Sequence, residues 1–378
     1  MFLGFAKSLA EPNLYILDRF LFLLLYVDDM LLAYQDKAVF ESILVQLKDR
    51  YQITDLGTAQ RFLGLEIVQL ASGEYRLSQT EYIKAVLYQF GMANANPVST
   101  PLAKDTSLDV SATLLDNAAS QKEYMSIIGS LMYTALGTRP DITFAVTKLS
   151  QYNHDPRTTH MTAAKRVLRY LKYSQDLGLV FRKNSDLTFS NLHKLHAYTD
   201  GDWAGNPHDT KSISGYVFFL GAPISWKSKR QSIIATSTTK AEFTAFLDVS
   251  KQALWLRQLL EDIHYGQEET IKGKQTPRKE SDSGFNIESN VAEPPYPPYA
   301  HGDITIFSDS ERAIANIKGE GIPARNNHFD IRLLMSRELQ EHQVVNFTYV
   351  PSKLNRADGF TKGLDIGRHQ FIVQLQME

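Results

Sequence analysis

Residues 196–227 read HAYTDGDWAGNPHDTKSISGYVFFLGAPISWK and contain three short strand-forming runs separated by polar or turn-forming residues. The runs are 196–199, 215–220 and 224–227, and Gly221-Ala222-Pro223 joins the last two. β-Branched and aromatic residues bounded by turn signals are typical of strands, and strands that follow one another closely usually pair as neighbours. This stretch therefore predicts a three-stranded meander.

A long helix and further strands follow the meander. Ser237 to Thr239 are possible N-caps, and apolar residues recur behind them at helical spacing, at Phe243, Phe246, Leu247 and Leu254. The pattern then predicts a strand at 304–307, helices near 310–318 and 328–341, a strand at 344–350 and a terminal helix from about Asn355. This alternation predicts one α/β domain over residues 191–378, with a mixed five-stranded sheet and flanking helices.

Residues 265–302 interrupt that domain. They are rich in Glu, Lys, Pro, Ser and Gly, and they include Pro294-Pro295-Tyr296-Pro297-Pro298. Such a composition buries too little apolar surface to offset the entropy of ordering. Because the strand pattern resumes afterwards, we predict a disordered insertion within one domain.

Four acidic residues are expected at the ends of these elements. Asp200 ends the first strand, Glu242 lies in the first turn of the long helix, Asp309 ends the fourth strand and Asp358 opens the last helix. Carboxylates suit Mg²⁺, and two such ions about 4 Å apart can activate water on one side of a phosphate and stabilise the leaving oxygen on the other. Placement alone does not separate this site from solvated surface acids. A metal site requires the four carboxyl groups to converge, with no lysine between them.

Upstream, a smaller α/β layer is predicted. Residues 15–35 indicate two strands with Asp28-Asp29 at the polar tip between them, followed by a helix near 37–50 and strands at 62–70 and 75–77. From 79 to 173 the pattern is mostly helical, with a looser stretch at 97–119. The first half of the chain therefore predicts a small sheet followed by a helical subdomain.

The composition is that of an ordinary chain of two or three domains, with 378 residues, 43% hydrophobic and 22% charged. The absence of cysteine excludes disulfides, zinc–thiolate sites and thiol nucleophiles, and it fits an intracellular protein. The longest apolar run, 20–27, is too short to span a bilayer, so no membrane partner is expected. A net charge of −2 means that any attraction to phosphates must come from local basic patches.

Several sequence motifs in the second half of the chain resemble those of the ribonuclease H domain of Ty1/copia-type retrotransposons. They are His196-Ala197-Tyr198-Thr199-Asp200-Gly201-Asp202-Trp203, Lys211-Ser212-Ile213-Ser214-Gly215-Tyr216, Ala241-Glu242-Phe243, Ser308-Asp309-Ser310 and Ala357-Asp358-Gly359-Phe360-Thr361-Lys362. The resemblance implies a ribonuclease H-like fold and assigns the metal-binding, catalytic acids to Asp200, Glu242, Asp309 and Asp358. It also implies two Mg²⁺ or Mn²⁺ ions and cleavage of RNA in RNA–DNA hybrids. The resemblance does not assign Asp202 as a metal ligand, and Asp202 stays a candidate assisting residue beside the site.

The first half resembles the reverse transcriptase of the same family. Tyr26-Val27-Asp28-Asp29 looks like its polymerase active-site hairpin, and Phe62-Leu63-Gly64-Leu65-Glu66-Ile67 and Ile128-Gly129-Ser130-Leu131-Met132-Tyr133 are similar to its late palm and thumb. The resemblance implies a partial palm at 1–96, a helical thumb or connection at 97–190 and the ribonuclease H-like domain at 191–378. It assigns Asp28 and Asp29 as catalytic residues of the polymerase.

The chain departs from the family pattern at its beginning. Nucleotide addition in the family needs a third aspartate on an earlier strand, and the chain begins too late to contain it. We therefore expect no polymerase activity from this chain alone, with the missing part in an upstream portion of the same polyprotein. Lys240 replaces an acidic residue two positions before Glu242, which is expected to weaken metal binding slightly.

Basic residues give candidates for contact with nucleic acid. Lys165, Arg166, Arg169 and Lys172 form a stripe at helical spacing, while Lys227, Lys229 and Arg230 form a second cluster. Basic grooves follow the phosphate backbone without reading sequence. A solvated helix face explains the first stripe equally well. His328 is a candidate phosphate contact, although a structural hydrogen bond or solvent exposure is the stronger alternative.

These observations predict a reverse transcriptase–ribonuclease H fragment of a retrotransposon, acting on RNA–DNA hybrids with two divalent ions. By the same resemblance it belongs inside the cell, in the cytoplasm or nucleus or within a virus-like particle. The alternative is a catalytically silent remnant or nucleic-acid-binding module, since several motifs depart from the family pattern.

Overall fold

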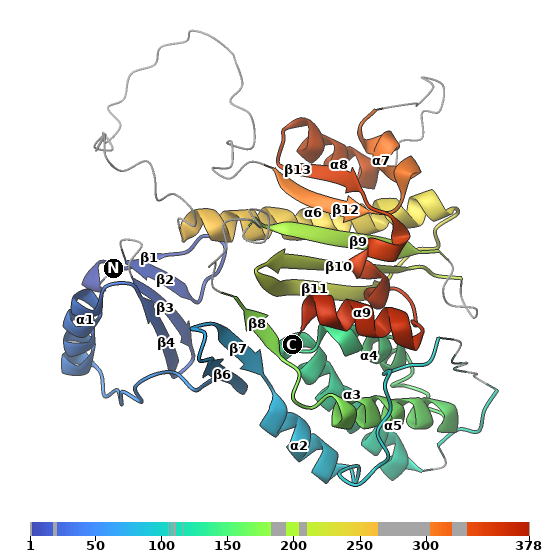
Figure 1. The fold of residues 1–378 in the computed structure, drawn as a ribbon, viewed down its shortest axis with the longest axis horizontal. Coiled ribbons are helices and arrows are strands. Elements are labelled where there is room, and N and C mark those ends of the chain that lie inside the picture. Colours follow the sequence, from blue (N-terminus) through green and yellow to red (C-terminus); the bar gives the residue numbers. More distant parts are fainter. Residues whose placement is uncertain are drawn as a thin grey trace. The chain divides into compact units, whose positions relative to one another are not determined.

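The computed structural model describes residues 2–17, 21–104, 106, 108, 111–115, 117–182, 194–203, 210–263, 303–319 and 331–377 (Figure 1). The predicted insertion at 265–302 and His328 lie outside these ranges. The chain forms two compact units. The first contains residues 1–53, 252–303 and 338–345, and the second contains 54–251, 304–337 and 346–378.

The first unit is built on an antiparallel sheet with strand order β1-β2-β3-β4. Its strands are β1 (Ala6–Lys7), β2 (Leu14–Leu17), β3 (Leu21–Tyr26) and β4 (Asp29–Tyr34). Helix α1 (Lys37–Arg50) begins at Asp36, whose carboxylate accepts the N–H groups of the first turn. Leu21 and Leu23 of β3 pack with Ile43 and Leu47 of α1, which gives the unit its apolar core.

The predicted hairpin forms, but its tip is shifted by one residue because Asp29 already belongs to β4, and the range 15–35 also contains most of β2. Strands β3 and β4 pair from Leu21↔Tyr34 to Tyr26↔Asp29, so the turn consists of Val27 and Asp28. Val27 has φ 54°, a value that side chains branched at Cβ rarely adopt. Asp28 and Asp29 are both exposed.

The second unit contains the predicted helical region. Its helices are α2 (Thr80–Gln89), α3 (Ala118–Gly137), η2 (Pro140–Ile142), α4 (Thr143–Ser150) and α5 (Thr158–Tyr173). They share one apolar core, which includes Tyr124, Leu131 and Val167. An antiparallel sheet of β5 (Arg61–Phe62), β6 (Leu65–Gln69), β7 (Tyr75–Ser78) and β8 (Leu179–Phe181) joins residues from both sides of this region.

The second sheet of this unit carries the predicted meander. Strands β9 (His196–Asp202), β10 (Ile213–Leu220) and β11 (Ala222–Arg230) are antiparallel neighbours. With β12 (Ile304–Ser308), which is parallel to β9, and β13 (Val345–Tyr349), the order is β11-β10-β9-β12-β13. The predicted α/β class and mixed five-stranded sheet are therefore confirmed. The helices that follow β11 along the chain are α6 (Thr238–Asp262), α7 (Glu311–Ile317), α8 (Ile331–Glu341) and α9 (Ile366–Gln376), and the last part of α6 and of α8 belongs to the first unit.

Two glycines let other elements approach the strands of this sheet closely. A Cβ at Gly215 of β10 would lie 2.5 Å from Cβ of Phe360, and a Cβ at Gly201 of β9 would lie 2.9 Å from the carbonyl oxygen of Ala241. Asp200 pairs with Gly215 and Gly201 pairs with Ser214. Since alternate residues face opposite sides of a sheet, the 3₁₀ helix η4 (Arg356–Phe360) packs on the Asp200 face and α6 on the other.

The predicted positions of two acids within their elements are wrong. Asp358 does not open the last helix: it lies in η4, and α9 begins separately at Ile366. The side chain of Asp365 caps α9 by accepting the N–H of Arg368, which starts a new helix after the turn. Glu242 is the fifth residue of α6 and lies just past its first turn, because Ser237, the earliest of the possible N-caps, accepts the N–H of Lys240.

No helix in the described ranges is both long and apolar enough to cross a membrane.

Candidate metal centre

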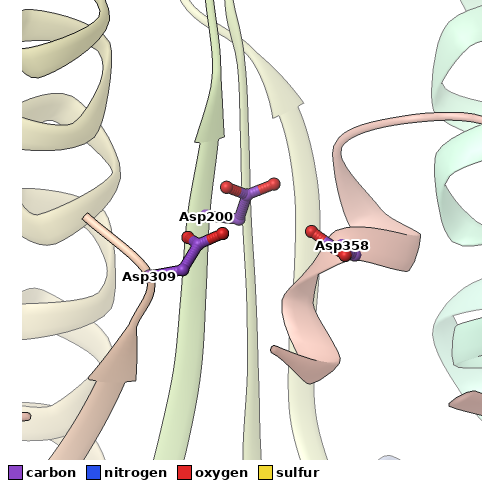
Figure 2. Close-up of side chains that lie close together, drawn as sticks. All are labelled: Asp200, Asp309 and Asp358. Carbon is purple, nitrogen blue, oxygen red and sulfur yellow. The ribbon is translucent and has the colours of Figure 1, made fainter. Parts of the chain in front are cut away.

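Three of the four predicted acids converge. Asp200 of β9, Asp309 at the end of β12 and Asp358 of η4 each offer a carboxylate oxygen within 4.8 Å of the others. Figure 2 shows the three side chains together beside the sheet. Asp200 and Asp358 are buried, and Asp309 is partly exposed. Residues far apart in sequence thus form one cluster of oxygen ligands.

The segment 352–361 fixes two of these carboxylates. Asn355 donates its side-chain N–H to Asp309 Oδ1 at 3.2 Å and to the carbonyl of Thr199 at 3.1 Å. Ser352 donates its hydroxyl to Asp309 Oδ2 at 2.5 Å, and the Thr361 hydroxyl donates to Asp200 Oδ2. These contacts aim the carboxylates by hydrogen bonds from outside the cluster.

Arg368 of α9 holds the third carboxylate together with the backbone around it. One of its terminal nitrogens donates to Asp358 Oδ2 at 3.0 Å, to the carbonyl of Asn355 at 2.7 Å and to that of Ser352 at 2.9 Å. The other donates to the carbonyl of Lys353. A guanidinium presents several donors in a fixed fork, so Arg368 fastens the segment 352–358 to α9.

Glu242 lies outside the group of three but is electrostatically coupled to it. Its side chain is buried, and its Oε2 has no hydrogen-bond partner among the residues that the structure describes. Burial raises its pKa well above the ordinary value, and the charges of Asp200 and Asp309 raise it further. A buried carboxylate oxygen without a partner is costly, and a cation beside it would remove that cost.

The charge density of the cluster also perturbs Asp200. Burial raises the pKa of Asp200 to about 6, the nearby Lys362 opposes the increase, and Asp309 adds to it. Oxygen-only donors from several carboxylates are the set that hard divalent cations prefer. The donor set, its spacing and the unpartnered Glu242 oxygen therefore fit Mg²⁺ or Mn²⁺.

The expectation that no lysine would lie among the acids is wrong, so a metal ion could occupy this cluster only if the lysine moved aside. Lys362 Nζ lies 2.7 Å from Asp358 Oδ1 and 3.9 Å from Asp200 Oδ2. Its pKa is raised because the attraction of Asp200 and Asp358 outweighs the opposing effect of burial. Carboxylates this close repel one another, and an ammonium between two of them relieves the repulsion. The side chain of Lys362 is 43% exposed, so its head group borders solvent.

The other predicted acids lie elsewhere. Asp28 and Asp29 are at the exposed end of the β3–β4 hairpin, and within the described ranges no third His, Cys, Asp or Glu groups with them as a candidate metal site. Asp202 is on the Asp200 face of β9, since the two are separated by one residue. Burial raises the pKa of Asp202, and Lys362 and Lys148 oppose that shift.

The basic stripe on α5 is engaged within the chain. Arg166 donates to the hydroxyl of Thr100, Arg169 donates to the carbonyl of Asn96, and Lys172 donates to the carbonyl of Ala93. These three side chains hold the segment 93–100 against the helix. Lys165, the fourth member of the stripe, is half-buried.

The second basic cluster is divided between the two faces of the sheet. The register pairs Lys227 with Tyr216 and Lys229 with Ser214, which in turn pair with Thr199 and Gly201 of β9. Directly opposed residues share a face, so these two lysines lie on the side opposite Asp200. Arg230 pairs with Ile213, and Ile213 pairs with Asp202, which puts Arg230 on the Asp200 face.

The sequence did not predict roles for Lys362, Arg368, Asn355 and Ser352. Lys362 follows Asp358 by four residues, a spacing at which ion pairs commonly form on helices, so it had a usable signal. Arg368 had none, because three of its four acceptors are backbone carbonyls and leave no trace in residue type.

A sequence profile described as reverse transcriptase (RNA-dependent DNA polymerase) matches residues 1–104. A transposon Ty5-1 protein of Saccharomyces cerevisiae is 33% identical over 247 residues, which are 64% of this chain and 77% of that protein. The chain belongs to the Ty1/copia-type retrotransposon polyprotein family.

Other relatives of this copia-type chain are much longer. The retrovirus-related Pol polyprotein from transposon TNT 1-94 of Nicotiana tabacum is 33% identical over 368 residues, 95% of this chain and 25% of the polyprotein. That from transposon RE1 of Arabidopsis thaliana is 38% identical over 266 residues, 69% of this chain and 17% of the polyprotein. The chain therefore spans a quarter or less of these curated polyproteins. Among solved structures, ribonuclease H1 of Halobacterium salinarum matches 44% of this chain and 94% of its own at 17% identity, with a TM-score of 0.26.

Proposed function

We propose that this chain is a reverse transcriptase–ribonuclease H fragment whose five-stranded sheet carries a divalent-metal site that hydrolyses the RNA strand of RNA–DNA hybrids. The observation that carries the proposal is the convergence of Asp200, Asp309 and Asp358 within 4.8 Å. Glu242 adds a fourth carboxyl group, coupled electrostatically to Asp200 and Asp309, whose buried Oε2 has no hydrogen-bond partner among the described residues.

Each side chain has a distinct part in this proposal. Asp200, Asp309 and Asp358 would hold Mg²⁺ or Mn²⁺, with Glu242 as a further ligand. A bound divalent pair supplies activation of the attacking water and stabilisation of the leaving oxygen. Asn355, Ser352 and Thr361 orient the carboxylates through their hydrogen bonds to Asp309 and Asp200. Arg368 keeps Asp358 at the cluster and satisfies the backbone around it.

The substrate follows from the chemistry together with the family. Divalent ions held by carboxylates are suited to the hydrolysis of phosphodiesters. The chain belongs to a retrotransposon family, and its residues 1–104 match a reverse transcriptase profile. Both facts support an RNA–DNA hybrid as the substrate. The expectation that the chain alone does not extend primers stays a prediction, which a primer-extension assay with Mg²⁺ tests.

Asp309→Asn tests the nuclease proposal. The substitution removes one metal-binding charge while keeping the shape of the side chain, and cleavage of a labelled RNA–DNA hybrid in Mg²⁺ or Mn²⁺ should fall by at least roughly a hundredfold, as when a ligand to the ions is lost. Asp303→Asn is the matched control, because Asp303 is exposed and immediately precedes the other end of β12. It should cleave at the wild-type rate. Equal cleavage by wild type and Asp309→Asn would contradict the proposal.

A second candidate is a catalytically silent module that binds nucleic acid. Lys362 favours it, because the ammonium occupies the space between Asp200 and Asp358 where a cation would be held. This function predicts that fluorescence anisotropy detects hybrid binding at protein concentrations at which no product forms with either metal.

A further inference from the structure

Lys362 forms ion pairs with two of the carboxylates that a divalent ion would need. Its Nζ lies 2.7 Å from Asp358 Oδ1, and Asp200 Oδ2 is 3.9 Å away. Asp358 and Asp200 are both members of the three-carboxylate group, and Asp309 completes it. Apart from Arg368, which also pairs with Asp358, Lys362 brings only one positive charge to these three carboxylates, and the two positive charges of a divalent ion would neutralise them better.

The lysine is placed so that it can leave. It lies in the turn between η4 and α9, and its side chain is 43% exposed, whereas those of Asp358 and Asp200 are 7% and 8% exposed. An ammonium on a flexible four-carbon stem is strongly hydrated in water. Moving Nζ outward would return it to solvent without leaving a buried positive charge.

Arg368 contacts the same carboxylate in a different way. It donates to the other oxygen of Asp358, Oδ2, and to three backbone carbonyls of the segment 352–355, and its side chain is 17% exposed. Removing it would take away the donor to Asp358 Oδ2 and to the carbonyls of Lys353 and Asn355. The two cations that pair with Asp358 therefore have different surroundings. Lys362 lies beside the other carboxylates of the cluster, whereas Arg368 holds the backbone of the segment 352–355.

We infer that Lys362 is an internal counter-ion that occupies the metal position of the cluster and is displaced when a divalent cation binds. The inference rests on the proposed metal site. The lysine lets three carboxylates stay together before the ion arrives, and it weakens the affinity for the ion by competing with it. Arg368 instead raises that affinity, because it holds Asp358 in place.

The test measures metal affinity directly. Full-length wild type and variants are titrated with Mn²⁺ while the electron paramagnetic resonance signal of free Mn²⁺ is followed. Lys362→Met removes the charge but keeps the length of the side chain, and it should bind Mn²⁺ roughly tenfold more tightly, as expected when a competing unit charge a few ångströms away is lost. Lys362→Arg keeps a cation and should not gain affinity. Arg368→Met should bind about 10–100-fold more weakly, as for the loss of other groups that orient ligands.

Two further variants separate the inference from the proposed function. Lys353→Met removes a charge from an exposed lysine of the same segment, whose side chain is in none of the ion pairs of the cluster, and it should bind as wild type does. Asp309→Asn should abolish the tight site and so identifies it. Tight binding by Lys362→Met where wild type binds none would support the inference in its strongest form, with the lysine blocking the site.

Other outcomes count against it. If wild type binds Mn²⁺ at a site sensitive to Asp309→Asn and Lys362→Met binds equally or more weakly, the inference is wrong while the metal site stands. If Lys353→Met gained as much Mn²⁺ affinity as Lys362→Met, the effect would come from the net charge of the protein rather than from the position of Lys362, and the inference would be wrong. If neither wild type nor Lys362→Met binds, the proposed metal site itself fails and the inference fails with it.

Discussion

His369 of α9 is the residue through which the C-terminal helix meets a buried polar network. Its Nε2 lies 3.0 Å from the hydroxyl of Tyr170, which donates to Asp141 at 2.6 Å. Arg139 completes the network by donating to both oxygens of Asp141 and to Ser174, with its own side chain fully buried. Buried ion pairs persist where each partner is fully hydrogen-bonded, and here the network includes groups from η2, α5 and α9.

The network predicts a pH-dependent stability that His369 controls. Burial lowers the pKa of His369 below 6.5, the nearby Asp141 opposes the shift, and Arg139 adds to it. The unfolded chain therefore takes up a proton more readily, so this residue's contribution to stability is present above pH 6.5 and is lost as the pH falls through the lowered native value. His369→Gln should reduce the loss of unfolding free energy between about pH 7.5 and about pH 5.

Urea denaturation of wild type and His369→Gln at several pH values measures the effect. Asp200, whose pKa is raised from 3.8 to about 6, works in the opposite direction and loses stability as the pH rises through that range. Its contribution is common to both proteins and cancels in their difference. Parallel pH profiles for the two proteins would show that His369 does not carry the acid sensitivity.

At this scale the sequence predicted the acids but not what holds them. Asp200, Asp309 and Asp358 each belong to a distinctive sequence motif, and their side chains lie together as predicted. The side chains of Asn355 and Arg368, which support these acids, are themselves positioned by backbone carbonyls of Thr199, Ser352 and Asn355, which any residue type could provide. Lys362 belongs to the same sequence motif as Asp358. Its ion pair with Asp358 depends on the conformation of the turn after η4, which a pattern of residue types does not specify.

Among the elements, η4 and β10 depend on each other through Gly215. The close approach of Phe360 to this glycine brings η4, and with it Asp358, onto the sheet. The sequence predicted one terminal helix from about Asn355, whereas the structure has η4 and α9 as two separate helices. The break spans residues 361–365 and contains Gly363, where an added Cβ would lie a tight 3.1 Å from the carbonyl oxygen of Lys104.

Gly215→Ala should therefore displace η4 and weaken the metal site. The added methyl would lie 2.5 Å from Cβ of Phe360, a contact that requires the backbone of η4 to move. We expect weaker Mn²⁺ binding and a loss of about 1–3 kcal/mol in the free energy of unfolding, as for other overpacked sites. Titration with Mn²⁺ and urea denaturation measure the two effects.

Gly129→Ala is the matched control for this substitution. Gly129 lies within α3, and a Cβ added there would have no atom of the described chain within 4 Å. Alanine in an exposed helical position is favoured by roughly 0.5–1 kcal/mol over glycine, so this variant should gain stability and keep its metal affinity. Wild-type metal affinity in Gly215→Ala would mean that Asp358 does not depend on the close contact.

In the whole molecule, the helical region and the five-stranded sheet belong to the same compact unit. Ile213 at the start of β10 is part of the apolar core formed by α2 to α5. The indole N–H of Trp226 on β11 donates to the carbonyl of Ala135 on α3, at 2.9 Å. His369 adds the polar contact with Tyr170 of α5. Such long-range packing is set by the three-dimensional arrangement, and the order of elements along the sequence does not specify it.

These contacts bear on the predicted boundary near residue 190, which stays a prediction. A fragment of residues 191–378 would keep the four acids and the sheet, but it would expose the apolar surface around Ile213 and leave His369 and Trp226 without their partners on α5 and α3. Exposed core surface of this kind destabilises a domain and promotes association.

We therefore expect the fragment to unfold at a lower urea concentration than the full chain and to bind Mn²⁺ more weakly, because η4 and α9 lose the helices that support them. Circular dichroism during urea denaturation, with size-exclusion chromatography to detect association, measures this. A monomeric fragment with the full chain's unfolding midpoint and Mn²⁺ affinity would establish an independent domain boundary at that position.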